Sequence, residues 1–476
     1  MTSRYLKLVL ILSAFCIVAG EVAAQEPEPP VQTQSPKPAG RGVPSLDPNV
    51  QDQNAQQDWK PDTSPATGLQ APTIGNPELR HSYFVPGFQY TGSGQNQQLS
   101  ASSPGGWYST HFLGANLSFL QQWSRSQLAI NYSGGGFFTS SPGQDNGSYH
   151  QLAFAQSFAW RRWQLQILDQ FSYLPESQFG FGGGTGLSVP GISGSLSPST
   201  PPIVPAVTPN QTNFGAIGPQ YNNSVVSQIT YQTSPRGSIT VGGSYGISRF
   251  TDAGNIESNT YVGNAGYNYA LTKADTIGVF YRFSSYHFLS GFPAVGDQLA
   301  SFVYERKVTR RLALQLEGGP DITDRKILLG VQVRSVSGSG GANLRYAFQN
   351  GSLSGSYSHG VSSGGGLLSG STTDQVNASA NKSIGRAWSV QANAGFARNR
   401  TLPDSGAAQS LGFNSIFAGG GISRPIGRNV DFSLAYQARI QQTSTSACTG
   451  ASCSSSYTQS SIFLNLQWHS RPFVLR

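Results

Sequence analysis

The residue types that carry most enzyme chemistry are scattered along this chain of 476 residues. Its six histidines stand at positions 81, 111, 150, 287, 359 and 469, and none begins an HExxH metal motif. No GxSxG segment lies at a strand-to-helix turn, where a serine nucleophile would be expected. A Ser-His-Asp site forms in space rather than in sequence, and Tyr357-Ser358-His359 is its best candidate here. We nevertheless expect no enzyme activity, no cofactor and no metal, because no motif supports them.

Two cysteines follow the N-terminal region. Cys448 and Cys453 stand in a segment rich in serine and threonine, STSACTGASCSSS. In an exported chain this spacing favours a disulfide within a loop. Metal binding is the alternative, but two thiols without a nearby histidine or acid make a poor site.

Alternation of apolar and polar residues is the strongest pattern in the chain. Residues 413–442 predict a strand, a tight turn at 424–428 and a second strand. In the second strand Val430, Phe432 and Leu434 occupy one face, and Asp431 and Ser433 occupy the other. A period of two predicts a β-strand with one apolar and one polar side. The pattern lasts longer than the usual strand of about 5–6 residues and suits a tilted bilayer-spanning strand of about 9–11 residues.

Turns recur at regular intervals after residue 80, and many are short and basic, such as Arg161-Arg162 and Arg310-Arg311. The connections on the opposite side are longer and rich in Gly, Ser and Asp, and residues 320–334 are among them. Regular turns between alternating strands predict an all-β, antiparallel up-and-down transmembrane β-barrel. Counting by direction gives about 18 strands, with about 16 as the alternative, because a single bacterial chain closes with an even number. Residues 82–90 supply the first strand despite Pro86.

The alternation also predicts which charged residues face the lumen. These residues share a face with Gln, Asn and Ser rather than with the apolar set: Arg282, Glu305, Glu317, Arg345, Asp431 and Arg439. Rings of arginine favour anions in a pore. The alternative, which we favour, is that opposite charges pair along the wall. Asp169 is the exception, because alternation places it with Leu165 and Ile167 on the lipid side. A charge there is costly, so we expect a bulge or a register shift near it.

Three regions divide the chain. Residues 1–24 predict a secretory signal peptide, with Arg4 and Lys7 before an apolar segment and small residues before Gln25. Residues 25–79 are rich in Pro, Gln and Asp and predict a disordered periplasmic linker. Residues 80–476 form the expected barrel. Its connection at 174–220 holds eight prolines, and we expect a long extracellular loop that acts as a constriction or lid.

The end of the barrel carries the most specific resemblance. Ile462, Leu464, Leu466 and Trp468 alternate in the last strand, although residues 469–476 follow the aromatic residue. With the signal peptide, short turns and long loops, this strand resembles Gram-negative outer-membrane, porin-like β-barrels. In that family such a strand is an insertion signal for the barrel-insertion machinery. The chain is also loosely similar, in architecture and composition, to porin-like barrels that accompany polysaccharide export genes.

Charge and resemblance together define the expected function. The chain has 30 Lys and Arg against 22 Asp and Glu, but about half of the basic residues after the linker lie near short turns or in the tail, where they suit lipid headgroups rather than nucleic acid. We expect outer-membrane lipid and lipopolysaccharide as surroundings, with a homo-oligomer and a periplasmic partner of the linker as open alternatives. The predicted function is a cell outer-membrane channel for passive diffusion of small polar or anionic solutes. The alternatives are a non-conducting structural barrel and an outer-membrane component of polysaccharide export.

Overall fold

A computed structural model describes the barrel region of the chain. The described residues are 82–98, 106–140, 145–174, 219–251, 255–272, 274–289, 291–309, 311–326, 332–348, 350–364, 366–385, 387–402, 412–443 and 456–475. The predicted signal peptide, the predicted linker, most of the 174–220 connection and the Cys448–Cys453 pair lie outside these residues.

Eighteen long strands and one two-residue strand make up the described chain. Their lengths of 12 to 17 residues follow from the extended alternation in the sequence. The strands are β1 (Tyr83–Gln98), β2 (Gly106–Gln122), β3 (Ser126–Thr139), β4 (Gly147–Ala159), β5 (Trp163–Leu174), β6 (Gln220–Gln232), β7 (Gly237–Phe250), β8 (Ser258–Ala270), β9 (Asp275–Phe288), β10 (Val295–Lys307), β11 (Leu312–Lys326), β12 (Gln332–Phe348), β13 (Gly351–Ser362), β14 (Ser371–Ile384), β15 (Trp388–Thr401), β16 (Gly412–Ile426), β17 (Val430–Thr443), β18 (Ser456–His469) and β19 (Phe473–Val474).

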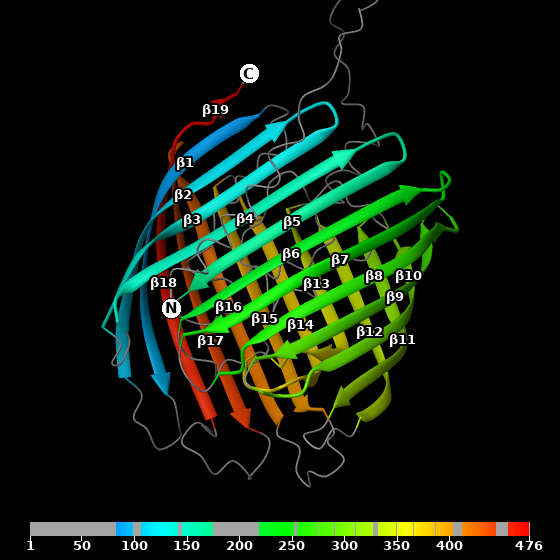
Figure 1. Cartoon of the computed structure of the whole chain (residues 1–476). Helices are drawn as coiled ribbons and strands as arrows, with labels where there is room; N and C mark the ends of the chain where they lie inside the picture. Colours follow the sequence, from blue (N-terminus) through cyan, green and yellow to red (C-terminus); the bar gives the residue numbers. More distant parts are fainter. Residues whose placement is uncertain are drawn as a thin grey trace, which may run out of the picture. The chain divides into compact units, whose positions relative to one another are not determined.

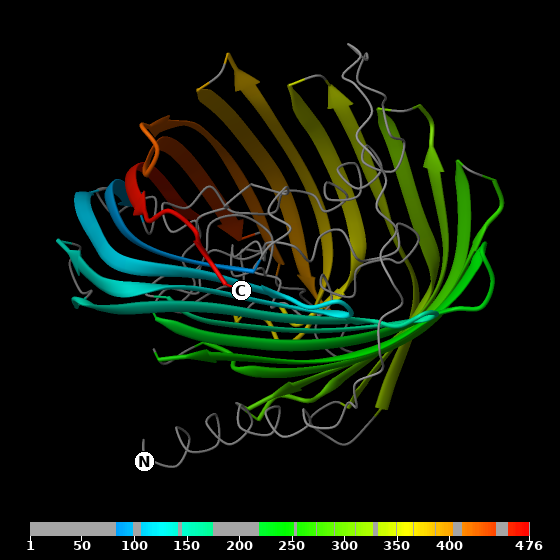
Figure 2. The same cartoon turned by 90° about the horizontal axis from the view of Figure 1, so that it is seen from above.

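The long strands close into one antiparallel barrel. Each strand pairs with the next in sequence, and β1 pairs with β18 to complete the ring (Figures 1 and 2). The predicted count of 18 strands is therefore confirmed, and β1 extends the predicted first strand to Gln98. Closure removes the free edges that an open sheet would expose, so the backbone groups along the barrel are paired.

The short strand β19 belongs to the tail after Trp468. Phe473 pairs with Phe84 and Val474 with Tyr83, at the beginning of β1. The two phenylalanine rings lie 6.3 Å apart. The tail therefore folds back onto the first strand, beside the seam at which β1 and β18 close the barrel.

The turn of the 413–442 hairpin shows how a short connection is made. β16 and β17 pair up to Ile426 and Val430, and Gly427 in the turn has a φ of +76°. An L-residue with a side chain rarely adopts this conformation, whereas glycine does so readily. The sequence Arg-Pro-Ile-Gly-Arg therefore provides the backbone freedom that the reversal needs.

The predicted connection at 320–334 is wrong. β11 continues to Lys326 and β12 begins at Gln332, so Pro320 lies inside a strand. The ladder between β10 and β11 omits the pairs that would join Ala300 to Pro320 and Ser301 to Gly319. Proline, which has no N–H to donate, is tolerated at such an interruption.

The predicted bulge at Asp169 is also wrong. β5 pairs without interruption with β4 and with β6, and Asp169 faces Phe154 on one side and Val225 on the other. The register therefore keeps Asp169 on the outward face. The Asn223 side chain donates a hydrogen bond to Asp169 Oδ1 at 2.8 Å. This bond satisfies part of the hydrogen-bonding capacity of the carboxylate on the outward face.

The outward face of the barrel is the one expected of a bilayer-spanning protein. Its large apolar side chains are exposed: Phe88 is 62% exposed and Val279 also 62%. Five tryptophans stand at the short-turn ends of the strands, and all are exposed: Trp123, Trp160, Trp163, Trp388 and Trp468. An apolar band bordered by aromatic residues matches a transmembrane barrel. Among the described residues, no helix has the length and hydropathy needed to cross a membrane.

Candidate channel interior

The ladder register assigns every strand residue to the inward or the outward face. In β1 the inward residues Gln89, Thr91 and Ser93 are almost fully buried, whereas the intervening Phe88 and Tyr90 are exposed. Residues paired directly across a ladder share a face, so this assignment extends from strand to strand around the barrel. The resulting interior consists mainly of Gln, Asn, Ser and Thr.

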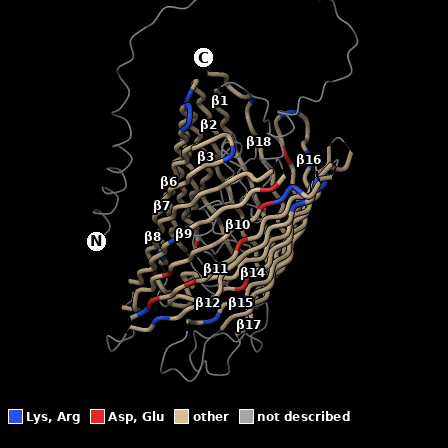
Figure 3. Tube along the Cα trace, turned by 90° about the vertical axis from the view of Figure 1, so that its right-hand side faces the viewer, with Lys and Arg blue, Asp and Glu red and all other residues tan. Residues whose placement is uncertain are grey.

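All six lumen candidates from the sequence lie on this inward face. They are Arg282 on β9, Glu305 on β10, Glu317 on β11, Arg345 on β12, and Asp431 and Arg439 on β17. Four thus come from adjacent strands and two from a single strand elsewhere in the ring. Figure 3 shows that charged residues are sparse along the tube.

The register shows further inward charges beyond the six predicted ones. Asp297, Asp321, Arg325 and Lys307 share the inward face of β10 and β11. Asp297 and Asp321 are 0% and 1% exposed. Asp321 was missed because residues 320–334 were assigned to a loop. The alternation that includes Glu305 and Glu317 already contained the signal, since Asp297 and Asp321 have the same parity on the same strands.

Arg282 makes the closest charge contact among these groups. Its Nη2 lies 3.5 Å from Asp297 Oδ2 on the neighbouring strand. Asp321 stands on the next strand in the row of Arg282 and Leu299, so two carboxylates neighbour one guanidinium. Arg282 thus forms its closest ion pair with Asp297 of β10, and its charge also interacts with Glu317 of β11, another of the six predicted residues.

Arg439 belongs to a network at the barrel seam. Its Nη2 donates to the Tyr457 hydroxyl at 2.9 Å, and this hydroxyl donates to Gln459 Oε1 at 2.8 Å. Gln459 in turn donates to Gln95 of β1 and lies 3.4 Å from the Tyr108 hydroxyl of β2. These buried bonds join β17, β18, β1 and β2, so they tie together the strands that close the ring. At the short-turn end, Asp431 Oδ2 lies 3.5 Å from His469 Nε2.

Large side chains fill the inward face of the first strands. Phe112, Phe137 and Tyr149 form a buried cluster. Gln89 donates to Ser133 Oγ at 3.2 Å and to the Tyr149 hydroxyl at 3.1 Å. We call these five residues the buried wall. Glycine allows its packing: a Cβ on Gly135 would lie 2.0 Å from the Leu113 carbonyl oxygen.

A different surface occurs on the inward faces of β12 to β15. Most inward residues there are small, and the exposed ones include Ser337, Ser358, Asn381 and Ser389. We call these four residues the accessible lane. Short polar side chains leave room beside the wall and can hydrogen-bond to water or to a polar solute.

The candidate catalytic segment does not assemble a Ser-His-Asp site. Ser358 faces inward and His359 faces outward, because they are consecutive residues of β13. His359 Nδ1 lies 2.6 Å from Asp374 Oδ1, on the outside of the barrel. Ser285 Oγ and His287 Nε2 are 3.0 Å apart, but no third residue of the described chain hydrogen-bonds to His287. Within the same residues, no group of three or more His, Cys, Asp or Glu could hold a metal.

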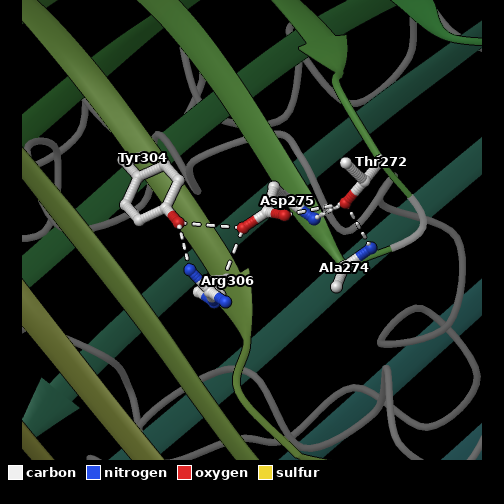
Figure 4. A network of polar contacts seen from close by, with 5 residues as sticks. All are labelled: Thr272, Ala274, Asp275, Tyr304 and Arg306. Carbon is white, nitrogen blue, oxygen red and sulfur yellow. Dashed lines mark hydrogen bonds and ion pairs between the residues drawn. The ribbon is translucent and has the colours of Figure 1, made fainter.

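Polar contacts stabilise the outward rim at the short turn between β8 and β9 (Figure 4). The Thr272 hydroxyl donates to Asp275 Oδ2 at 2.8 Å, and the Tyr304 hydroxyl donates to Asp275 Oδ1 at 2.8 Å. Arg306 Nε lies 3.7 Å from the same carboxylate. Asp275 is the first residue of β9, next to the turn, and its carboxylate accepts both hydrogen bonds. This network anchors the turn to β10.

The four residues of the predicted insertion signal share the outward face of β18. Ile462, Leu464, Leu466 and Trp468 are 37–45% exposed. Trp468 stacks with Phe88 of β1, with ring centroids 5.9 Å apart. These residues therefore form part of the lipid-facing surface at the seam.

Comparisons with solved structures find matches of low identity. OpdQ of Pseudomonas aeruginosa aligns at 10% identity over 83% of this chain and 100% of that chain, with a TM-score of 0.43. OpdK of Pseudomonas aeruginosa, solved with vanillate, aligns at 9% identity over 81% and 99%, with a TM-score of 0.43. OccAB1 of Acinetobacter baumannii aligns at 8% identity over 82% and 97%, also at 0.43. At these identities and scores the likeness assigns neither a family nor a solute.

No protein-family model matches this chain, and no curated protein matches it. The functional conclusion therefore depends on the faces of the barrel itself.

Proposed function

We propose that the protein is an outer-membrane channel for passive diffusion of small polar solutes, including anions. The observation that carries this proposal is the contrast between the two faces of one closed wall. The outward face is apolar and exposed, whereas the inward face is polar and remains exposed along the accessible lane. A barrel of about 18 strands is wide enough to enclose an aqueous channel.

The inward charges support passage without strong selection by net charge. Among the described strand residues, Arg282, Lys307, Arg325, Arg345 and Arg439 are balanced by Asp297, Glu305, Glu317, Asp321 and Asp431. The arginines offer donors to a carboxylate or phosphate. The nearby acids limit the positive potential, so neutral polar solutes are expected to pass as well.

Cysteine modification in planar bilayers tests this function. Ser358→Cys places a thiol in the accessible lane, and Ala378→Cys places one on the outward face of the next strand. Both are made in a Cys448→Ser, Cys453→Ser background. The unmodified proteins should conduct, and a charged methanethiosulfonate reagent should lower the conductance of Ser358→Cys alone. Absence of conductance in both proteins, or an equal response of both, would contradict the proposal.

A second candidate is an outer-membrane role in polysaccharide export. The observation that favours it is the set of exposed inward amides and hydroxyls, including Ser358, Asn381 and Ser389, which suit the hydroxyl groups of sugars. This role requires a dedicated periplasmic partner. A photocrosslinker attached at Trp59→Cys should then give one dominant adduct, and a diffuse set of adducts would argue against it.

A further inference from the structure

Asp169 is an acidic residue on the apolar outward face of the barrel. It stands near the middle of β5, on the outward face, between Phe154 and Val225. The other outward Asp, Glu, Lys and Arg residues of the described strands lie close to strand ends, as Arg249, Asp275 and Arg398 do. Strand ends reach the headgroup layer, whereas the middle of a strand faces hydrocarbon. Asp169 is therefore the acid that the bilayer core would have to accommodate.

More polar residues surround it on the outside of the barrel. Gln156 of β4, Asn223 and Ser227 of β6 share its outward face. One continuous row joins Gln156 to Ile167, Ser227, Gly243 and Gly263 across five strands. We call Gln156, Asp169, Asn223 and Ser227 the outer polar patch. It is bordered on either side by aromatic residues, including Phe154, Tyr245 and Tyr261.

Asn223 satisfies the Asp169 carboxylate in part. Its amide donates to Oδ1, and the same nitrogen lies 3.4 Å from the Gln170 carbonyl oxygen. The described residues provide no hydrogen bond to Oδ2. A carboxylate oxygen turned toward hydrocarbon without a donor is unfavourable, because lipid chains cannot replace the hydrogen bonds of water.

We propose that the outer polar patch is the contact surface for a second copy of this chain. The patch holds both an acceptor, Asp169, and donors, the Gln156 amide and the Ser227 hydroxyl. A two-fold axis along the membrane normal brings the same residues of two copies together at the same depth. The donors of each copy then face the Asp169 carboxylate of the other. Lipid acyl chains offer no such donors.

The neighbouring glycines allow the two walls to approach closely. A Cβ on Gly263 would meet no atom within 4 Å, and one on Gly243 would come no nearer than 3.5 Å to the Val262 carbonyl oxygen. The outer surface beside Ser227 therefore carries few bulky side chains. Small residues at a membrane interface permit close backbone contact, which strengthens packing and hydrogen bonds between polar neighbours.

Cysteine crosslinking in outer membranes tests the surface directly. Ser227→Cys lies in the outer polar patch, and Ser460→Cys is an outward, similarly half-buried serine on β18. Both are made in a full-length Cys448→Ser, Cys453→Ser background. Oxidation should give a product of twice the chain mass with Ser227→Cys and not with Ser460→Cys. No product, an equal product from both variants, or an adduct of another mass would overturn the proposal.

Replacing the Asp169 carboxylate distinguishes a role in a dimer interface from a purely structural role. Asp169→Leu should lower the association constant of the purified protein in lipid nanodiscs by about tenfold, because a charge-assisted contact is lost. The same change should raise the thermal resistance of the monomeric barrel, since leucine suits hydrocarbon. Asp169→Asn keeps polar contacts and should retain more of the dimer. Unchanged association of Asp169→Leu, or loss of thermal resistance, would overturn the proposal.

Discussion

The buried wall of β1 to β4 and the accessible lane of β12 to β15 both lie on the inward face, but they are built in opposite ways. The buried wall uses large side chains, with Tyr149 fully buried beneath Phe112 and Phe137 and bonded to Gln89. The accessible lane uses serine and asparagine, which leave the sheet exposed. The interior of one barrel therefore contains both a closely packed part and a part whose side chains remain accessible. The two differ in the size of the inward side chains and, at Phe112 and Phe137, also in their polarity.

The largest loss of barrel assembly is expected from a substitution at Gly135, where the buried wall packs closely against the backbone of β2. Gly135→Val should prevent assembly of the barrel, because a Cβ there would lie 2.0 Å from the Leu113 carbonyl oxygen and 2.4 Å from the Gly114 Cα. Neither atom can move without disturbing the β2–β3 ladder. The heat-modifiable fraction on gels measures assembly. Gly338→Val is the matched control in β12, where a Cβ meets nothing within 4 Å, and it should assemble normally.

The stability of the folded barrel is also expected to depend on the ion pair between Arg282 of β9 and Asp297 of β10. Arg282→Ala should destabilise the folded barrel by about 3 kcal/mol, because it leaves the Asp297 and Asp321 carboxylates buried without the guanidinium. Urea unfolding in lipid vesicles measures the change. The double variant Arg282→Ala, Asp297→Asn should recover most of the loss, since one carboxylate is then neutral. Equal stability of the single and double variants would show that this charge pairing is not important.

Alternation was enough to predict most of the fold, because a period of two fixes both the strand and its face. It placed Asp169 on the outside correctly, and the added expectation of a bulge was wrong because Asn223 supplies a hydrogen bond from the next strand. Alternation cannot predict which residues of distant strands lie close together. The contact of Gln459 with Gln95 joins residues 364 positions apart. Likewise, the pairing of Phe473 with Phe84 depends on barrel closure.

A smaller change probes the hydrogen bonds of the buried wall. Tyr149→Phe keeps the ring within the Phe112 and Phe137 cluster but removes the hydroxyl that accepts from Gln89. The loss should be about 1 kcal/mol, because the Gln89 amide keeps its bond to Ser133. The urea midpoint should fall while single-channel conductance stays unchanged. A large change in conductance would mean that the buried wall also borders the solute path.

The smallest effect on folding, but a clear one on passage, is expected in the accessible lane. Ser337 faces the interior and is exposed, so Ser337→Trp should narrow the path and lower single-channel conductance by about twofold. Val336→Trp is the matched control, because the preceding residue of a strand points to the opposite face and already presents an apolar side chain to lipid, where Val336 is 70% exposed. Both proteins should assemble and unfold like the parent. If conductance fell equally in the two variants, the change would come from the sheet as a whole. If neither variant changed it, solutes would have to follow another part of the interior, and the distinction between the buried wall and the accessible lane would concern packing alone.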